Sequence, residues 1–476
     1  MTYLQAHQHL IRSQLRINTS LASCIIVRLN HQFIVSCAAK IKITTVGLVS
    51  GRKMAVSSRL MGLLGWGVLL SFICILQLAS ANEAALPECN FPAVYAFGDS
   101  LTDNGNAIAA FPDQFANAEL DPNGVEFPMH AADRYSDGKL VVDFLAFGVR
   151  QKPIYPVLRG TAGDFTFGTN FAASGAPARS VKVWRKDAGF STPFSLDVQQ
   201  QWFERYKVRV WFYESPIFNP NGRIWQSLPK LATVNESLFL VWSGYQDYFS
   251  GLYDKTLTPK QTLKIVPDVV EAIANHLTKM VTPMSYTPPA SKSLIMPTAS
   301  TILVVNLPPL GCVPAMLTLY GGPHAKYDSH GCLSDLNKIT REHNEMLAKK
   351  VDELRAKHSD VKLLYGDAHT VYTDILKDPK KYNVTSPLKA CCGVGGAYNF
   401  NKEVTCGHTG MFENKFVNLT VAPPCPNPAA HISWDGIHTS NTFNKAAVTA
   451  FLTGEHITPK GGLGCSPDFS HWDLRN

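Results

Sequence analysis

The stretch "FPAVYAFGDSLTDNGN", residues 91–106, passes from apolar residues directly into a polar turn that holds one serine, Ser100. The apolar half is typical of a buried strand, and Gly, Asp and Asn supply the tight backbone geometry of a turn. Ligands collect at the carboxyl ends of the strands in open parallel sheets, so this position makes Ser100 a candidate nucleophile. The competing interpretation is a strand that ends in an ordinary polar loop.

Three further apolar runs end in the same way, and they are "SLFLVWSG" (237–244), "TILVVNLPPLG" (301–311) and "VKLLYGD" (361–367). Continuous apolar runs of this length are typical of parallel strands that are buried on both faces. Between the last two lies a helical pattern over 334–360, with apolar residues at helical spacing. Repeated strand, helix, strand units predict an α/β sandwich. We expect one domain over residues 82–476.

The basic charge of the chain is concentrated at its N-terminus. Of 44 Lys and Arg residues, 8 lie in residues 1–81, which contain no acid, so that 36 basic residues face 37 acidic ones in the remainder. The formal charge of +7 therefore belongs to the N-terminal segment. The rest of the chain lacks the excess positive charge that nucleic-acid binding requires, so we expect no nucleic-acid partner.

The same segment predicts export. A basic run precedes an apolar stretch over residues 62–79, and "ASA" at 79–81 matches a small-residue cleavage site. We interpret residues 54–81 as a secretory signal peptide, with an uncleaved membrane anchor as the alternative. Residues 1–53 are an N-terminal extension, either an artefact of the start site or a targeting segment. After cleavage we expect no stable membrane insertion, and we expect the protein to be extracellular or in the cell wall.

Cysteine usage agrees with export. Eight cysteines lie beyond the segment that is removed, and an even number in an exported chain predicts disulfides, with 105 connectivities if all pair. The competing interpretation is a zinc site at Cys391, Cys392 and Cys406. Three Asn-x-Ser/Thr sequons predict N-glycosylation at Asn235, Asn383 and Asn418.

Candidate partners for Ser100 lie far downstream. "ISWDGIHTS" places Asp435 three residues before His438, so both side chains can come from one loop and reach a serine on another. "GTNFAASGA" at 168–176 has small residues suited to close backbone approach, and "SGYQDYF" at 243–249 offers an amide at Gln246. Each motif alone is also typical of an ordinary turn or polar loop.

Taken together, these motifs resemble the plant GDSL esterase/lipase family of the SGNH hydrolases. The resemblance runs from about Phe91 to Thr453 and includes, in family order, "FGDSLTDNGN", "RYSDGKLVVDFLA", "GTNFAASGA", "VVNLPPLGCVP", the pair His343 and Asn344, "ACCGVGGAYN" and "WDGIH". It implies a single three-layer α/β/α sandwich with a flavodoxin-like parallel sheet. This agrees with the fold class expected from the apolar runs.

The resemblance also implies roles for single residues. Ser100 matches the family's nucleophile, His438 its general base and Asp435 the acid that orients the base. The backbone N–H groups of Ser100 and Gly175 match two donors of the oxyanion hole. The family's third donor is an Asn in a "GxND" motif, whereas this chain has "GYQD", with Gln246 at that position. Because loss of one such donor costs roughly 10²- to 10³-fold in rate, a misplaced Gln246 predicts a slow enzyme.

The function expected is a secreted serine ester hydrolase that cleaves carboxylic esters, either lipids or acylated cell-wall components, through an acyl-enzyme. This mechanism needs no metal and no cofactor. One alternative is an acyltransferase with the same catalytic residues. Another is a weakly active or inactive protein that binds an acylated glycan, as the departure at Gln246 suggests. The acyl chain length, the disulfide pairing and the oligomeric state are not predicted.

Overall fold

The computed structural model describes residues 23–29, 32–38, 86–129, 133–159, 163–181, 192–216, 218–219, 227–287, 293–407, 410–412, 415–417 and 424–470. The chain divides into two units, Met1–Glu83 and Ala84–Asn476. In the first unit, strands β1 (Ser23–Leu29) and β2 (Gln32–Ala38) pair antiparallel. The predicted signal peptide over 54–81 lies outside the described residues.

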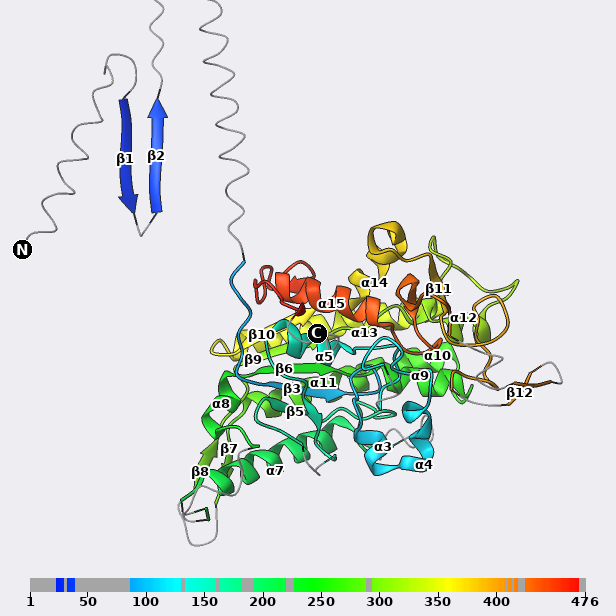
Figure 1. Cartoon of the computed structure of the whole chain (residues 1–476), viewed down its shortest axis with the longest axis horizontal. Helices are drawn as coiled ribbons and strands as arrows, with labels where there is room; N and C mark the ends of the chain where they lie inside the picture. Colours follow the sequence, from blue (N-terminus) through cyan, green and yellow to red (C-terminus); the bar gives the residue numbers. More distant parts are fainter. Residues whose placement is uncertain are drawn as a thin grey trace, which may run out of the picture. The chain divides into compact units, whose positions relative to one another are not determined.

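The second unit is built on a seven-stranded sheet in the order β15-β10-β9-β6-β3-β5-β4, part of which can be followed in Figure 1. The strands are β3 (Val94–Gly98), β4 (Tyr155–Pro156), β5 (Gly168–Asn170), β6 (Leu238–Trp242), β9 (Thr301–Val305), β10 (Lys362–Gly366) and β15 (Ile457–Thr458). Neighbours pair parallel, except that β15 is antiparallel to β10. Four of these strands, β3, β6, β9 and β10, are the predicted apolar runs. The short strand β5 was not predicted, because its sequence "GTN" has no apolar residue.

The order of the parallel strands is that of a flavodoxin-like sheet. Across the sheet the strands lie in the order β5, β3, β6, β9, β10 when the two-residue β4 is left out. In chain order these are the second, first, third, fourth and fifth strands. The chain therefore moves from β3 to one side, to β5, and then returns past β3 to the other side, to β6. Right-handed crossovers in opposite directions place their helices on opposite faces of the sheet.

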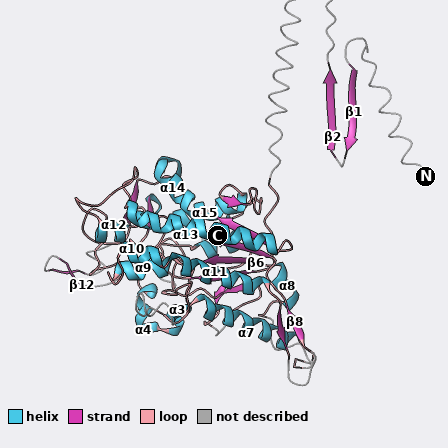
Figure 2. Cartoon of the chain, turned by 180° about the vertical axis from the view of Figure 1, so that it is seen from behind, coloured by secondary structure: helices cyan, strands magenta, loops and turns pink. Residues whose placement is uncertain are grey.

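Two groups of helices form these outer layers. In one layer α7 (Leu196–Glu214) and α13 (Ser334–Lys357) both pack against α11 (Val266–Val281), as seen from behind in Figure 2. In the other, α5 (Val141–Gly148) and α14 (Ala368–Lys377) both pack against α15 (Asn441–Thr453). The expected three-layer α/β/α sandwich is confirmed.

The remaining described elements are short. The helices are α3 (Asn106–Ala110), α4 (Pro112–Phe115), α8 (Leu231–Glu236), α9 (Tyr245–Tyr253), α10 (Pro259–Lys264) and α12 (Pro314–Tyr320), and the 3-10 turns are η1 (Ala116–Glu119), η2 (Leu310–Cys312), η3 (Pro379–Tyr382) and η4 (Pro428–Ala430). The strands are the pairs β7 (Met284–Tyr286) with β8 (Leu294–Met296), β11 (Ser386–Ala390) with β14 (His431–Ser433), and β12 (Gly410–Phe412) with β13 (Lys415–Val417).

Helix α13 carries the predicted apolar stripe. The apolar residues of this stripe are all buried, and they are Leu336, Ile339, Leu347, Val351 and Leu354. The "HN" pair lies on the same face. The hydroxyl of Tyr248 and Nδ1 of His343 are 2.7 Å apart. The Asn344 amide accepts a hydrogen bond from the N–H of Leu307 and donates one to its carbonyl. This pair therefore fixes the helix to α9 and to the loop that follows β9.

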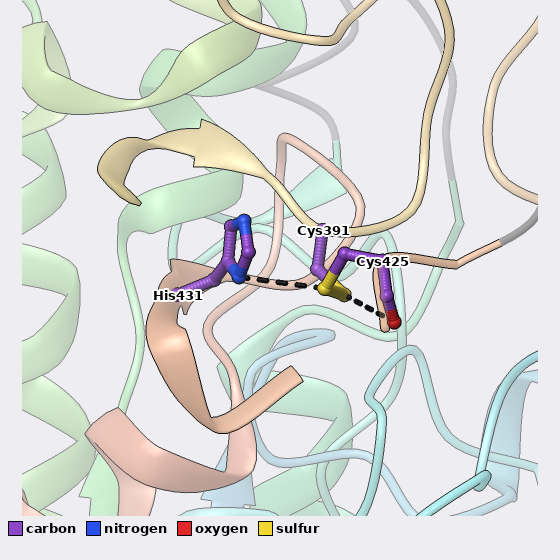
Figure 3. Close-up of side chains that lie close together, drawn as sticks. All are labelled: Cys391, Cys425 and His431. Atoms are coloured by element: carbon purple, nitrogen blue, oxygen red, sulfur yellow. Dashed lines mark hydrogen bonds between the residues drawn. A yellow bond between two sulfur atoms is a disulfide. The ribbon is translucent and has the colours of Figure 1, made fainter. Parts of the chain in front are cut away.

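The eight cysteines of the second unit form four disulfides, which confirms the predicted pairing in number. The pairs are Cys89–Cys465, Cys312–Cys332, Cys391–Cys425 and Cys392–Cys406. Figure 3 shows His431 beside one of them, with its Nδ1 3.4 Å from the sulfur of Cys425. The zinc alternative at Cys391, Cys392 and Cys406 is wrong, because zinc binds thiolates and these sulfurs are joined in disulfides.

Candidate active site

The site lies where the strand order reverses. Strand β3 has β5 on one side and β6 on the other, and all three run parallel. Ser100 and Gly175 lie in the loops that follow β3 and β5, and Gln246 lies in the first turn of α9, directly after β6. At such a reversal the neighbouring loops diverge to opposite faces, and the crevice between them is the usual ligand site of this class of sheet.

Close backbone packing explains the glycine two residues before Ser100. A Cβ atom on Gly98 would lie 2.1 Å from the carbonyl oxygen of Trp242 on the neighbouring strand β6. The buried amide of Gln199, on α7, accepts a hydrogen bond from the Gly98 N–H at 3.0 Å and donates one to its carbonyl at 2.8 Å. The last residue of β3 is therefore fixed on both sides before the chain turns into Ser100.

The acidic residue Asp103 shapes the turn that follows Ser100. Its buried carboxylate accepts hydrogen bonds from the backbone N–H groups of Gly105 at 2.8 Å, Asn106 at 2.7 Å and Ala107 at 3.1 Å. It also accepts one from the N–H of Ser174 at 2.7 Å. Asp103 therefore shapes its own turn and fixes the loop that carries Gly175 beside it. Sequence reasoning assigned Asp103 no role.

The buried amide of Asn106 joins the same two loops. Its Nδ2 donates to the carbonyls of Asn170 and Ala172, each at 2.8 Å. The amide of Asn170 in turn donates to the carbonyl of Thr102 at 2.7 Å. The polar residues of the two motifs thus satisfy one another's backbone groups, which stabilises a loop structure that apolar residues could not hold.

Ser100, His438 and Asp435 form a continuous chain of hydrogen bonds. The Nε2 atom of His438 is 2.9 Å from Oγ of Ser100, and its Nδ1 is 2.6 Å from Oδ2 of Asp435. The three side chains come together although 338 residues separate the serine from the histidine. All three are more than nine-tenths buried.

Asp435 also builds the loop that carries His438. Its Oδ1 accepts hydrogen bonds from the backbone N–H groups of Ile437 at 2.8 Å and His438 at 2.7 Å. Burial raises the pKa of Asp435, but the charge of His438 and these hydrogen bonds outweigh burial, and the net pKa lies below its ordinary value. The carboxylate is therefore ionised where it faces the imidazole.

The other two predicted donors lie at the same cleft. Gly175 adopts φ 74°, a left-handed conformation that favours glycine, and it lines the cleft with Gln246. The backbone N–H of Gln246 lies 3.4 Å from Oδ2 of Asp99. The next residue, Asp247, accepts hydrogen bonds from the N–H of Ala178 at 2.6 Å and from Nε of Arg179 at 3.0 Å. Asp247 thus ties the start of α9 to the loop of Gly175.

The cleft has a volume of about 350 Å³, and its aromatic lining residues are Phe115, Tyr135, Phe249 and Tyr253. On α9, Tyr245 stacks on Phe249 and Phe249 stacks on Tyr253, with ring centroids 5.3 Å and 5.2 Å apart. The other lining residues are mostly polar, and they include Gln114, Asn117, Ser174, Asp254 and Thr405. The lining therefore offers aromatic surface to an apolar group and hydrogen-bonding side chains to a polar one.

Asp99, next to Ser100, is a buried carboxyl. Burial raises its pKa from 3.8 to about 7, and the charge of Asp247 adds a smaller contribution. Hydrogen bonds from the N–H groups of Leu101 and Gln246 and the charge of His438 oppose this shift. The folded protein therefore favours the protonated form of Asp99. Stability from this group is full below pH 4 and is lost as the pH rises through about 7.

Replacing Asp99 by Asn removes this titration while it keeps the shape of the side chain. We expect the Asp99→Asn variant to have a higher Tm than the wild type above pH 7, and the difference to shrink as the pH falls from about 7 to about 4. Thermal unfolding of both proteins across this range measures the difference. A difference that does not change with pH would contradict the raised pKa of Asp99.

Comparison with known proteins shows the family of this chain. The family model described as "GDSL-like Lipase/Acylhydrolase" matches residues 94–451, from the start of β3 into α15. The chain belongs to the GDSL-like lipase/acylhydrolase family. It is by class a carboxylic ester hydrolase, and the predicted resemblance is confirmed.

Relatives of this family match most of the chain. A GDSL esterase/lipase of Arabidopsis thaliana is 33% identical over 383 residues, which cover 80% of this chain and 93% of the relative. A protein named "Esterase" of Hevea brasiliensis is 29% identical over 394 residues, with 82% and 92% covered. An Arabidopsis protein named "Alpha-L-fucosidase 3" is 29% identical over 380 residues, with 79% and 95% covered.

Proposed function

We propose that this protein is a serine ester hydrolase in which Ser100 is the nucleophile, His438 the general base and Asp435 the residue that orients the base. The observation that carries the proposal is the chain of hydrogen bonds from Ser100 Oγ through both nitrogens of His438 to Asp435, at 2.9 Å and 2.6 Å. A serine hydroxyl is a weak nucleophile at neutral pH, and such a chain activates it.

The reaction proceeds through a covalent acyl-enzyme. Ser100 Oγ attacks the ester carbonyl while its proton passes to Nε2 of His438, and the imidazolium is stabilised by Asp435. The negative charge on the carbonyl oxygen is received by the N–H groups of Ser100 and Gly175 and by the Gln246 amide. The alcohol leaves with the proton from His438. Water then attacks the acyl-enzyme by the same steps and restores Ser100.

The substrate proposed is a carboxylic ester, of a lipid or of an acylated cell-wall polysaccharide. The aromatic residues Phe249 and Tyr253 on α9 support binding of an apolar acyl group, and the polar residues of the cleft support a hydroxylated alcohol. Attack on an ester carbonyl is favoured over cleavage of a glycosidic bond, although one relative is named a fucosidase. Glycosidases generally act with a pair of carboxyl groups, whereas the proposed chain activates a serine.

We propose that the enzyme is exported and glycosylated. The four disulfides support an oxidising compartment. Two of the three sequon residues, Asn235 and Asn383, are exposed, and Asn418 lies outside the described residues. Among the helices in the described part of the chain, none is long and apolar enough to cross a membrane.

The test is to produce the full chain through a secretory pathway and to measure hydrolysis of p-nitrophenyl acetate and butyrate. We expect turnover without added metal, and we expect a fluorophosphonate probe to label the peptide that contains Ser100 in mass spectrometry. Mass spectrometry of the secreted protein also identifies its N-terminus, which we expect at Asn82. Products formed with a competing alcohol separate hydrolysis from acyl transfer. Folded protein with neither turnover nor label would overturn the proposal.

The Gln246 amide gives a separate prediction. Replacing Gln246 by Ala is expected to lower kcat by roughly 10²-fold, because one donor to the oxyanion is lost. Replacing it by Asn, the residue of the family motif, is expected to raise kcat above that of the wild type, since the shorter side chain holds the amide closer to its backbone. Steady-state kinetics of the two variants measure this. An Asn variant as slow as the Ala variant would exclude an amide donor at this position.

A further inference from the structure

An aromatic ring lies flat against the imidazole of His438. The rings of Tyr135 and His438 are stacked, with centroids 4.9 Å apart and planes inclined by 12°. Tyr135 also lines the cleft beside Ser100. We propose that Tyr135 is a positioning residue for the proposed general base, which it holds in plane and stabilises when the imidazole becomes charged. This inference rests on the proposed function of His438.

The geometry of His438 leaves one motion to be restrained. Both ring nitrogens are engaged at the ring edge, with Ser100 at 2.9 Å and with Asp435 at 2.6 Å. Rotation of the imidazole about its Cβ–Cγ bond would break both hydrogen bonds at once. A flat ring packed against the face of the imidazole opposes this rotation by steric contact. The hydrogen bonds at the edge of the imidazole oppose the rotation only after it has begun to stretch them.

Tyr135 can act in this way because its segment is joined to the start of α15, three residues after His438. The carboxylate of Asp137 accepts a hydrogen bond from the N–H of Asn441 at 2.8 Å, and the Asn441 side chain accepts one from the N–H of Lys139 at 3.0 Å. The Asn444 amide donates to the carbonyl of Lys139 at 2.9 Å. The segment that follows Tyr135 and the helix that follows His438, about three hundred residues apart in the sequence, are thus held together.

The other end of the Tyr135 segment is also fixed. The neighbouring Arg134 guanidinium donates two hydrogen bonds to Asp143 on α5, from Nε at 2.9 Å and Nη2 at 2.8 Å. A paired arginine and carboxylate define orientation as well as distance. The backbone on both sides of Tyr135 is therefore tied to secondary structure, so the position of its ring does not depend on the His438 contact alone.

The stack also favours the charged imidazole. When His438 takes the proton of Ser100 it becomes a cation, and the electron-rich face of a phenol ring attracts a cation. Burial raises the pKa of Tyr135 above its ordinary value, and the negative charges of Asp103 and Asp435 raise it as well. The ring therefore stays a neutral phenol. The proposed mechanism requires a neutral imidazole before proton transfer and a charged one in the transition state, so this attraction stabilises the transition state more than the ground state of the reaction.

The experiment compares Tyr135→Leu with Tyr135→Phe in the full secreted chain. Leucine fills space but has no π face, so we expect kcat on p-nitrophenyl acetate to fall by roughly 5- to 30-fold with KM little changed. Phenylalanine keeps the ring and is expected to stay within about twofold of the wild type. Tyr206→Leu is the matched control, since Tyr206 is a buried tyrosine that packs on Tyr95 in the core. We expect it to lower Tm without lowering kcat.

A second measurement does not depend on turnover. In protein with labelled histidine, the ring protons of His438, assigned by their loss in His438→Ala, are expected at high field because of the ring current of Tyr135. They should move downfield in Tyr135→Leu and stay in place in Tyr135→Phe. Unshifted protons in the wild type, full kcat in Tyr135→Leu, or equal losses in the two variants would each overturn the proposal. If these protons shift as expected but the wild type does not hydrolyse esters, the proposed function fails and the stack stands.

Discussion

Replacing Ser100 by Ala is expected to remove ester hydrolysis, lowering kcat by about 10⁴-fold or more. The proposed mechanism forms its covalent bond at Ser100 Oγ, and that atom lies 2.9 Å from the base His438. Without it, the remaining donors can bind the substrate and polarise its carbonyl, but only water can attack. End-point assays with p-nitrophenyl acetate and butyrate at high enzyme concentration measure the residual rate of hydrolysis.

This prediction is specific because alanine removes a single oxygen atom. Ser470→Ala is the matched control, since Ser470 is exposed near the C-terminal end of the described chain. We expect the control to keep wild-type kcat and both variants to keep the wild-type Tm. A Ser100→Ala protein that hydrolyses esters at the wild-type rate would exclude Ser100 as the nucleophile. If the folded wild type itself is inactive, a protein that binds an acylated glycan becomes the leading interpretation.

Replacing Asp435 by Asn is expected to lower kcat by about 10³- to 10⁴-fold while it leaves the loop folded. One oxygen of Asp435 accepts from two backbone N–H groups, and the other faces Nδ1 of His438 at 2.6 Å. An asparagine amide has only one oxygen. If its NH₂ group faces Nδ1, His438 carries its proton on Nε2 and cannot accept one from Ser100. If the amide is flipped, its NH₂ group opposes the two backbone donors.

The pH dependence of the stability distinguishes loss of the Asp435 charge from a general loss of structure. The pKa of Asp435 lies below its ordinary value, so its contribution to stability is present above that ordinary value and is lost as the pH falls through the lower one. We therefore expect the Asp435→Asn variant to be less stable than the wild type at neutral pH, with a difference that narrows in acid. Kinetics and thermal unfolding on the same samples measure both effects. An Asn variant with wild-type kcat would exclude the proposed role of Asp435.

Much of the scaffold follows from local sequence. Strands β3, β6, β9 and β10 are continuous apolar runs because helices cover both faces of the sheet, and burial on both faces leaves no alternation of polar residues. Helix α13 was predicted because its apolar residues recur at the period of a helix. Strand β5 was not predicted, because the neighbouring strands rather than its own three residues determine its conformation.

Pairings between distant residues depend on the tertiary structure. Eight cysteines allow 105 pairings, and the fold selects one because only sulfurs that it brings together can bond. The partners of Asp103 and the stack of Tyr135 on His438 were not predicted for the same reason. No local pattern records which distant loop a side chain will meet.

The sequence by itself determined strands β3, β6, β9 and β10, the long helix, the order of the motifs and the chemical identity of Ser100, Asp435 and His438, because each of these depends on residue type and short-range spacing. Only the tertiary structure decided that the three side chains meet at 2.9 Å and 2.6 Å, and that a tyrosine covers the imidazole. The physical reason is that the loop between β14 and α15, which carries Asp435 and His438, follows no strand of the seven-stranded sheet. Its place at the end of β3 therefore depends on packing and on buried hydrogen bonds between distant parts of the chain.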